Sequence, residues 1–182
     1  MKSKTSCLAL LVSLFAFHSP AFSGSDLSEP HTLIENGSFE TTFEIPLLGL
    51  TKKECLKNEG RWEDGACWTE ASNLVQISDL TVDPKTDYMS NFKKVYIYTV
   101  GINAHFCEFE APAQVIDPNH MVSYVKVEND YPDGPKQELC RVELNYDKNT
   151  EELDVVANYK CLQFCAVGSF LDTKVKRVEL KR

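Results

Sequence analysis

The segment KCLQFCAVGSF, residues 160–170, determines how the rest of the chain can be interpreted. It holds two cysteines, Cys161 and Cys165, inside an otherwise apolar run. Such a pair is compatible with a redox motif, with half of a metal site, or with the ends of two structural disulfides. The choice depends on the compartment in which the protein works and on the other cysteines of the chain.

The start of the chain has the layout of a secretory signal peptide. Lys2 and Lys4 form a short basic region, residues 7–17 are apolar, and Ala21-Phe22-Ser23 places small residues where a signal peptidase cleaves. We therefore expect cleavage after residue 23 and export of residues 24–182 to the periplasm or the extracellular space. The apolar run is shorter than the roughly 20 residues of a membrane-spanning helix, so no membrane span is expected after cleavage.

The exported part is strongly acidic. The whole chain has 19 basic and 27 acidic residues, and the signal peptide contains two of the basic ones, which leaves a net charge of −10. Nucleic acid and anionic membranes are poor partners for such a surface. The basic residues at 174–177 are interpreted as the solvated side of a last strand. We expect a partly ordered lead-in over residues 24–53 and one domain with its own core over residues 54–182.

The exported chain keeps an even number of cysteines, which predicts three disulfides in an oxidising compartment. They are Cys55, Cys67, Cys107, Cys140, Cys161 and Cys165. We expect Cys55 to pair with Cys67, because Gly60 and Asp64-Gly65 between them favour a hairpin. Alternation in their segments points Cys107 and Cys140 inward, where Cys161 and Cys165 can each reach one of them. A bond between Cys161 and Cys165 is the alternative, although it would close only a very short loop.

This setting favours a structural role for Cys161 and Cys165. A thioredoxin-type motif needs C-x-x-C at the start of a helix, whereas the spacing here is C-x-x-x-C in a sequence of β type. A zinc site drawn from Cys107, Cys161, Cys165 and His105 would need reduced thiols in a compartment that oxidises them. We therefore predict disulfides at these positions, and neither a metal nor another cofactor.

Short segments of β type follow one another along the chain, with turn residues between them. They cover residues 38–45, 74–82, 94–100, 105–110, 121–128, 138–146, 153–159, 161–170 and 173–180. This spacing predicts an all-β protein, an antiparallel sandwich or small barrel stapled by disulfides, with a Cys-closed hairpin near its N-terminal side. No long helix is predicted.

Few residues offer catalytic chemistry. The exported histidines are His31, His105 and His120, and the sequence contains no motif of a zinc protease, a serine hydrolase or a nucleotide-binding enzyme. Glu108 and Glu110 are the strongest candidates for the paired carboxylates of a hydrolase, but alternation places both on the outward, solvated side of a strand. We therefore expect a protein that is not an enzyme. A carboxylate-based hydrolase is kept as the third candidate function, after a binding protein and a structural component.

An acidic loop, stiffened by prolines, follows the segment 121–128. Its candidate binding residues are Glu128, Asp130, Tyr131 and Asp133. Loops on rigid scaffolds commonly carry recognition, so we predict here a surface for another protein. Carboxylate oxygens are also calcium ligands, and although the spacing is not that of an EF-hand, calcium binding by residues 128–135 stays open.

Three motifs in the C-terminal part occur together. They are Cys107-Glu108-Phe109, Cys140-Arg141-Val142-Glu143-Leu144, and the paired cysteines of 161–165 followed by Gly168-Ser169-Phe170. In these motifs the part from about 107 to 177 resembles an uncharacterised family of bacterial exported, cysteine-rich β-domains, some of which accompany proteins described as lysozyme inhibitors. The resemblance implies a binding or protective role, such as inhibition of a cationic wall-cleaving hydrolase, whose encounter with an acidic surface would be fast. A structural or envelope-assembly component is the alternative.

Overall fold

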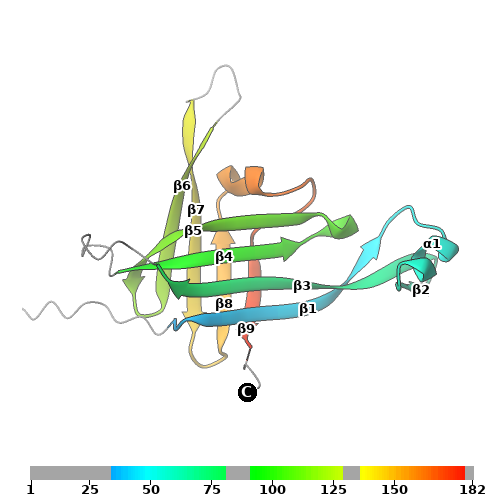
Figure 1. The fold of residues 1–182 in the computed structure, drawn as a ribbon, viewed down its shortest axis with the longest axis horizontal. Helices are drawn as coiled ribbons and strands as arrows, with labels where there is room; N and C mark the ends of the chain where they lie inside the picture. The colour runs from blue at the N-terminus through cyan, green and yellow to red at the C-terminus, as the bar shows by residue number, and fades with distance from the viewer. Residues whose placement is uncertain (1–33, 81–90, 129–135, 179–182) are drawn as a thin grey trace, which may run out of the picture.

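The computed structural model describes residues 34–80, 91–128 and 136–178 (Figure 1). The predicted signal peptide and three of the candidate binding residues, Asp130, Tyr131 and Asp133, lie outside these ranges. The described residues form an all-β structure with three short helical segments. Within them, no helix has the length and apolar character needed to cross a membrane.

The strands follow a simple order along the chain. They are β1 (Gly37–Leu47), β2 (Arg61–Glu63), β3 (Ala66–Asp79), β4 (Phe92–Val100), β5 (Phe106–Asp117), β6 (His120–Glu128), β7 (Gln137–Asp147), β8 (Glu152–Ala157) and β9 (Thr173–Arg177). The helical segments are α1 (Lys52–Lys57), η2 (Ile102–Ala104) and η3 (Tyr159–Phe164). Each sequence segment predicted as a strand therefore overlaps a strand of the structure, except for residues 161–170. Residues 81–82 and 179–180 of two predicted segments lie outside the described ranges.

The sheet closes on itself as a barrel. Its strand order is β1-β9-β8-β7-β6-β5-β4-β3-β2, and β1 also pairs with β3, so that eight strands form a ring in which every neighbour is antiparallel. Of the two architectures expected from the sequence, the structure has the barrel. A closed sheet leaves no unpaired edge inside the ring, which removes the main route by which exposed strands aggregate.

Alternation along the strands separates the core from the surface. In β5 the residues at odd positions from 107 to 115 are buried, and those at even positions are exposed. The interior is filled with large side chains, as expected for a ring of eight strands. The largest fully buried ones include Phe39, Phe109, Ile34, Ile97, Met121, Leu144, Leu153 and Leu171. The inside of the barrel is therefore an apolar core, and the charged residues face outward.

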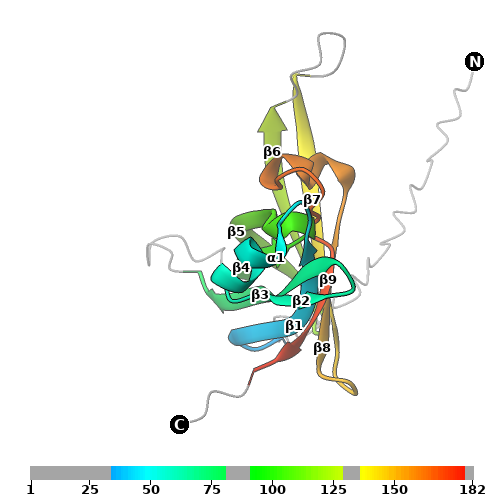
Figure 2. The same cartoon turned by 90° about the vertical axis from the view of Figure 1, so that its right-hand side faces the viewer.

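Strands β1 and β3 continue beyond the barrel as an extension (Figures 1 and 2). β1 pairs with β3 from Gly37 to Leu47 but with β9 only at Phe39 and Glu40. The far end of the extension carries α1 and the β2–β3 hairpin, which Figure 2 shows facing the viewer. Since β1 belongs to the ring, the described barrel includes residues 37–47, which the sequence prediction had placed in the lead-in.

The disulfide between Cys55 and Cys67 lies in this extension, with the two Cα atoms 5.5 Å apart. The predicted pairing is therefore present. Cys55 belongs to α1, so the closed segment consists of a helix followed by the β2–β3 hairpin and is not a hairpin alone. Gly60 packs against the bond: a Cβ atom there would lie 2.7 Å from Cys67 Sγ and 2.9 Å from Cys55 Sγ.

Candidate functional site

The connection from β8 to β9, residues 158–172, crosses one end of the barrel, and we call it the closing segment. Two disulfides hold it: Cys161 bonds to Cys140 of β7 and Cys165 to Cys107 of β5. In a ring of eight strands β5 lies opposite β9, so a connection between β8 and β9 that is bonded to β5 must pass over the barrel end. Both bonds agree with the prediction that Cys107 and Cys140 point inward and are each reached by one cysteine of the pair.

The prediction of a strand over residues 161–170 is wrong, because η3 occupies residues 159–164. Asn158 begins this 3-10 helix: its Oδ1 accepts hydrogen bonds from Lys160 N and Arg141 N, each at 3.2 Å. Its Nδ2 donates to Leu139 O at 3.0 Å. β8 is already paired on both sides, by β7 and β9, so the ring has no position for a further strand here.

The closing segment packs firmly onto the core. The ring of Phe164 meets that of Phe109 edge to face, with the centroids 5.2 Å apart. Lys160 forms an ion pair with Glu138 of β7, and this contact raises the pKa of the lysine. An aromatic contact of this kind contributes about 0.5–1.5 kcal/mol beyond the burial of its surface. Together with the two disulfides, these contacts fix the position of η3 relative to β5 and β7.

The second half of the closing segment is held by the connection between β4 and β5. Thr99 Oγ1 donates a hydrogen bond to Phe170 O at 2.5 Å, and Ala166 N donates to Phe106 O at 2.9 Å. His105 Nδ1 contacts the carbonyl oxygen of Val167. This half is therefore tied to the barrel by backbone and side-chain contacts from two neighbouring strands.

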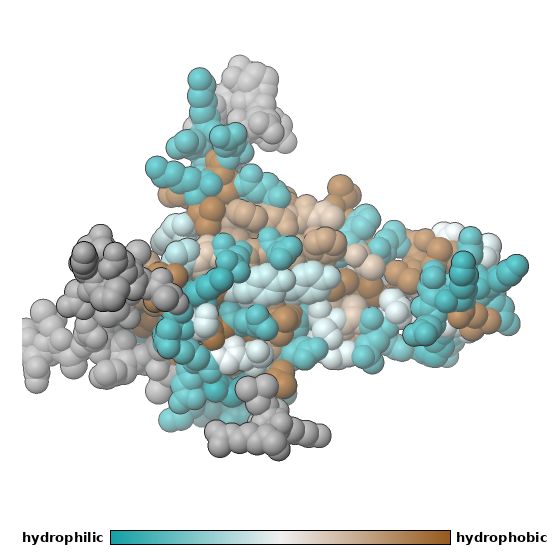
Figure 3. Space-filling view, in the orientation of Figure 1, coloured by the Kyte–Doolittle hydropathy of each residue, from teal (hydrophilic) through white to brown (hydrophobic). Residues whose placement is uncertain are grey.

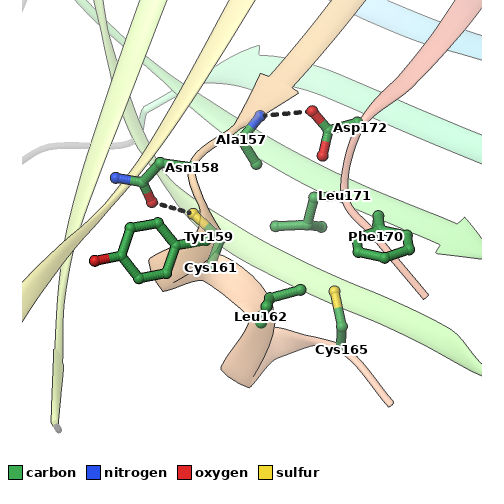
Figure 4. A pocket seen from close by; sticks show the side chains of 9 residues that line it. All are labelled: Ala157, Asn158, Tyr159, Cys161, Leu162, Cys165, Phe170, Leu171 and Asp172. Atoms are coloured by element: carbon green, nitrogen blue, oxygen red, sulfur yellow. Dashed lines mark hydrogen bonds between the residues drawn. The ribbon is translucent and has the colours of Figure 1, made fainter. Parts of the chain in front are cut away.

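A shallow pocket lies between the end of β8, η3 and residues 170–172, which lead into β9 (Figure 4). Its volume is about 210 Å³, and most of its lining is apolar. The lining residues are Ala157, Asn158, Tyr159, Cys161, Leu162, Cys165, Phe170, Leu171 and Asp172. The two lining sulfurs are in disulfides, and Asp172 Oδ1 accepts a hydrogen bond from Ala157 N at 3.2 Å. These groups offer a contact surface for an apolar group beside one carboxylate.

Large apolar side chains of the closing segment stand exposed. Three of them line the pocket, with exposed fractions of 71% for Tyr159, 46% for Leu162 and 61% for Phe170, and Val167 of the same segment is 87% exposed. Single exposed apolar residues are common on protein surfaces, whereas a group of them is a candidate interaction site. We call these four residues the apolar rim.

Sequence reasoning missed the apolar rim. A strand over residues 161–170 would have sent Leu162 and Phe170 to the same face and Val167 to the other, so no common surface was expected. One signal was available in the sequence. Asn158 is a residue type that commonly begins a helix.

The residues predicted from the sequence as binding or catalytic lie elsewhere. Glu128 ends β6 as an exposed residue and pairs across the hairpin with Gln137. Glu108 and Glu110 lie on the outer face, as expected: Tyr96 Oη donates to Glu108 at 3.3 Å, and Lys94 pairs with Glu110 at 2.8 Å. Burial, followed by the charge of the neighbouring Glu108, raises the pKa of Tyr96.

Comparison with other proteins adds no further assignment. No family model matches the chain, and neither a curated protein nor a solved structure matches it. Within residues 34–80, 91–128 and 136–178, no group of three or more histidine, cysteine, aspartate or glutamate side chains is placed to hold a metal ion. The resemblance to exported cysteine-rich domains therefore stays a prediction.

Proposed function

We propose that this is an exported, non-enzymatic binding protein that recognises another protein through its closing segment. The observation that carries the proposal is the apolar rim on a segment held by two disulfides. Three disulfides indicate an oxidising environment, and the periplasm or the extracellular space is the place of action that we propose.

The size and the lining of the pocket favour a protein partner. Pockets for small molecules usually measure about 300–1,000 Å³, and this one measures about 210 Å³. Such a hollow suits a single apolar side chain, and aromatic residues such as Tyr159 and Phe170 are typical anchors at the centre of protein interfaces. A surface that is already rigid loses little conformational entropy on binding, which favours affinity.

Charge narrows the class of partner. The exported chain has a net charge of −10, so a cationic protein would be attracted over a distance before the apolar surfaces meet. The version of this function that we favour is an inhibitor of, or a protector against, a cationic wall-cleaving hydrolase. In this version the apolar rim makes the short-range contacts and the acidic surface accelerates the encounter.

The test uses oxidised residues 24–182 and a panel of purified wall-cleaving hydrolases that includes a c-type lysozyme. Binding is followed by calorimetry at low salt, and inhibition by the clearing of a cell-wall suspension. The variant Tyr159→Ala/Phe170→Ala should bind at least about tenfold more weakly, since central aromatic anchors commonly contribute 2 kcal/mol or more. Ile116→Ala is the matched control, because Ile116 is 47% exposed on β5, outside the closing segment.

Two results would count against the proposal. One is the absence of binding to every hydrolase of the panel at low salt. The other is a double variant that binds as tightly as the control. Stable homo-oligomers of the free protein, measured by sedimentation, would favour the structural or envelope-assembly role instead.

A further inference from the structure

A stretch of β3 is open on one side. β3 pairs with β1 along Cys67–Ile77, but its other side pairs with β2 only at Ala66–Trp68 and with β4 only at Leu74–Asp79. Between them, Thr69–Asn73 has no second strand among the residues that the structure describes. None of these five residues is buried, and the side chains are small except for Glu70. Alternate backbone N–H and C=O groups of this stretch point away from β1.

The side chain of Asn73 ends the pairing between β3 and β4. Its Oδ1 accepts a hydrogen bond from Val100 N at 2.8 Å, so that a side chain takes the place of the next ladder bond. Beyond this point the chain turns into η2, and Asn103 of η2 accepts a hydrogen bond from Leu48 N at 2.7 Å. The open stretch Thr69–Asn73 therefore begins at a defined point, where the hydrogen bond of Asn73 ends the pairing of β3 with β4.

A hollow of about 620 Å³ lies at this open edge. Its lining combines both faces of the β1–β3 extension with the ends of β4 and η2. The residues are Glu40, Ile45, Leu47, Thr69, Glu70, Ala71, Ser72, Leu74, Tyr98, Val100 and Ala104. Figure 3 shows apolar surface, in brown, where the barrel meets the extension. The hollow is about three times as large as the pocket of the closing segment.

The charge at this edge is negative and partly uncompensated. Glu44 and Glu70 lie directly opposite each other on β1 and β3, an arrangement that destabilises a strand pair when both are charged. Arg61 neutralises Glu44 at 2.7 Å, and Lys176 lies directly opposite Glu40 on β9, whereas Glu70 forms no ion pair within the described ranges. One carboxylate, that of Glu70, therefore lines the hollow without an ion-pair partner.

We propose that an extended, basic segment of a partner protein adds a strand to β3 at Thr69–Asn73. Exposed strand edges bind extended peptides through backbone hydrogen bonds, and the side chains on either face give selectivity. Basic side chains on the face of Glu70 would neutralise it. Apolar side chains on the opposite face would lie beside Thr69 and Ala71 of β3. The segment that fits this edge therefore alternates basic and apolar residues.

A second copy of this chain fits the edge poorly. Two copies paired edge to edge would bring the same glutamates together, in a protein whose net charge is already −10. Like charges on facing strands oppose pairing. The contact proposed here is separate from the closing segment, so its failure leaves the function proposed above untouched.

The test uses a capped seven-residue peptide of alternating lysine and valine as the probe. Binding to oxidised residues 24–182 is measured by calorimetry, and its place by the amide shifts of the isotope-labelled protein. We expect shifts at residues 69–73, and an affinity that falls with added salt. Glu40→Lys/Glu70→Lys should weaken binding at least about tenfold and should bind the corresponding glutamate–valine peptide instead. Glu151→Lys, in the exposed turn before β8, is the matched control and should bind the lysine–valine peptide as the wild type does.

A second probe tests the hydrogen bonds without changing the protein. The same peptide, N-methylated on alternate residues, loses the donors of one edge while it keeps its charge. One of the two methylation registers should abolish binding, and the other should preserve it. Equal binding of both methylated peptides, equal binding to the charge-reversed variant, or a dimer of the free protein paired through this edge would overturn the proposal.

Discussion

Removal of the disulfide between Cys140 and Cys161 should destabilise the whole barrel. This bond joins the closing segment to β7 and has a sequence separation of 21 residues. By the chain-entropy relation, a closed loop of this length contributes about 3.3 kcal/mol to the free energy of unfolding. Both cysteines are buried, so alanine is the appropriate replacement, since serine would bury unpaired hydroxyl groups.

The double variant Cys140→Ala/Cys161→Ala should therefore unfold at a lower denaturant concentration. For a domain of this size, about 3 kcal/mol corresponds to roughly 6–12 °C in the midpoint of thermal unfolding. The assay is urea unfolding followed by circular dichroism, with thermal unfolding as a second measurement. The slope of the free energy with urea should stay close to that of the wild type, provided that the unfolded state exposes a similar surface.

The variant Cys55→Ala/Cys67→Ala is the control for this experiment. The same relation assigns about 2.8 kcal/mol to its loop, whose sequence separation is 12 residues. The bond lies in the extension, outside the ring of strands, so we expect local loosening of α1 and β2 and almost no shift in the unfolding of the barrel. Equal shifts of the two variants, or no shift for Cys140→Ala/Cys161→Ala, would refute the structural role assigned to the closing segment.

Three further predictions concern single positions. Gly60→Ala places a Cβ atom 2.7 Å from Cys67 Sγ and should loosen the extension, seen as faster amide exchange there. Gly101→Ala places one 2.7 Å from the carbonyl oxygen of residue 168, so it should displace the second half of the closing segment and weaken binding to the partner. Asp79 has a pKa below its ordinary 3.8, because a lysine of β4 and Asn36 bond to it. The contribution of Asp79 to the free energy of unfolding is fully present above pH 3.8 and is lost as the pH falls through the lowered pKa. The difference in urea midpoint between wild type and Asp79→Asn should therefore vanish in acid.

Much of the barrel could be predicted from the sequence, because buried and exposed residues alternate clearly in several of its strands, most strictly in β5. In β5 and β7, apolar residues at every second position distinguish the inner face of the strand from the outer face. The same alternation predicts that Cys107 and Cys140 point inward. Closure could not be predicted. It depends on pairing between β1 and β3 and between β1 and β9, and strand order is not encoded in the spacing of turns.

The helical parts were missed for local reasons. Thr51 and Glu54 form a capping box at the start of α1, a sequence pattern that predicts the beginning of a helix even when the helix is short. Asn158 caps η3 in a similar way, but the apolar residues after it resemble a buried strand. The candidate site was missed for the same reason, since the apolar rim exists only when residues 159–164 are helical. The hollow at β3 depends on where two neighbouring strands end, which is a property of the folded sheet.

Two cross-links hold the closing segment over the barrel end and so create its apolar surface. Disulfide mapping of the natively exported protein tests this claim most directly, by mass spectrometry of a digest prepared without reduction. We expect the pairs 55–67, 107–165 and 140–161, with no free thiol in residues 24–182. A bond between Cys161 and Cys165, or free thiols at these positions, would contradict it.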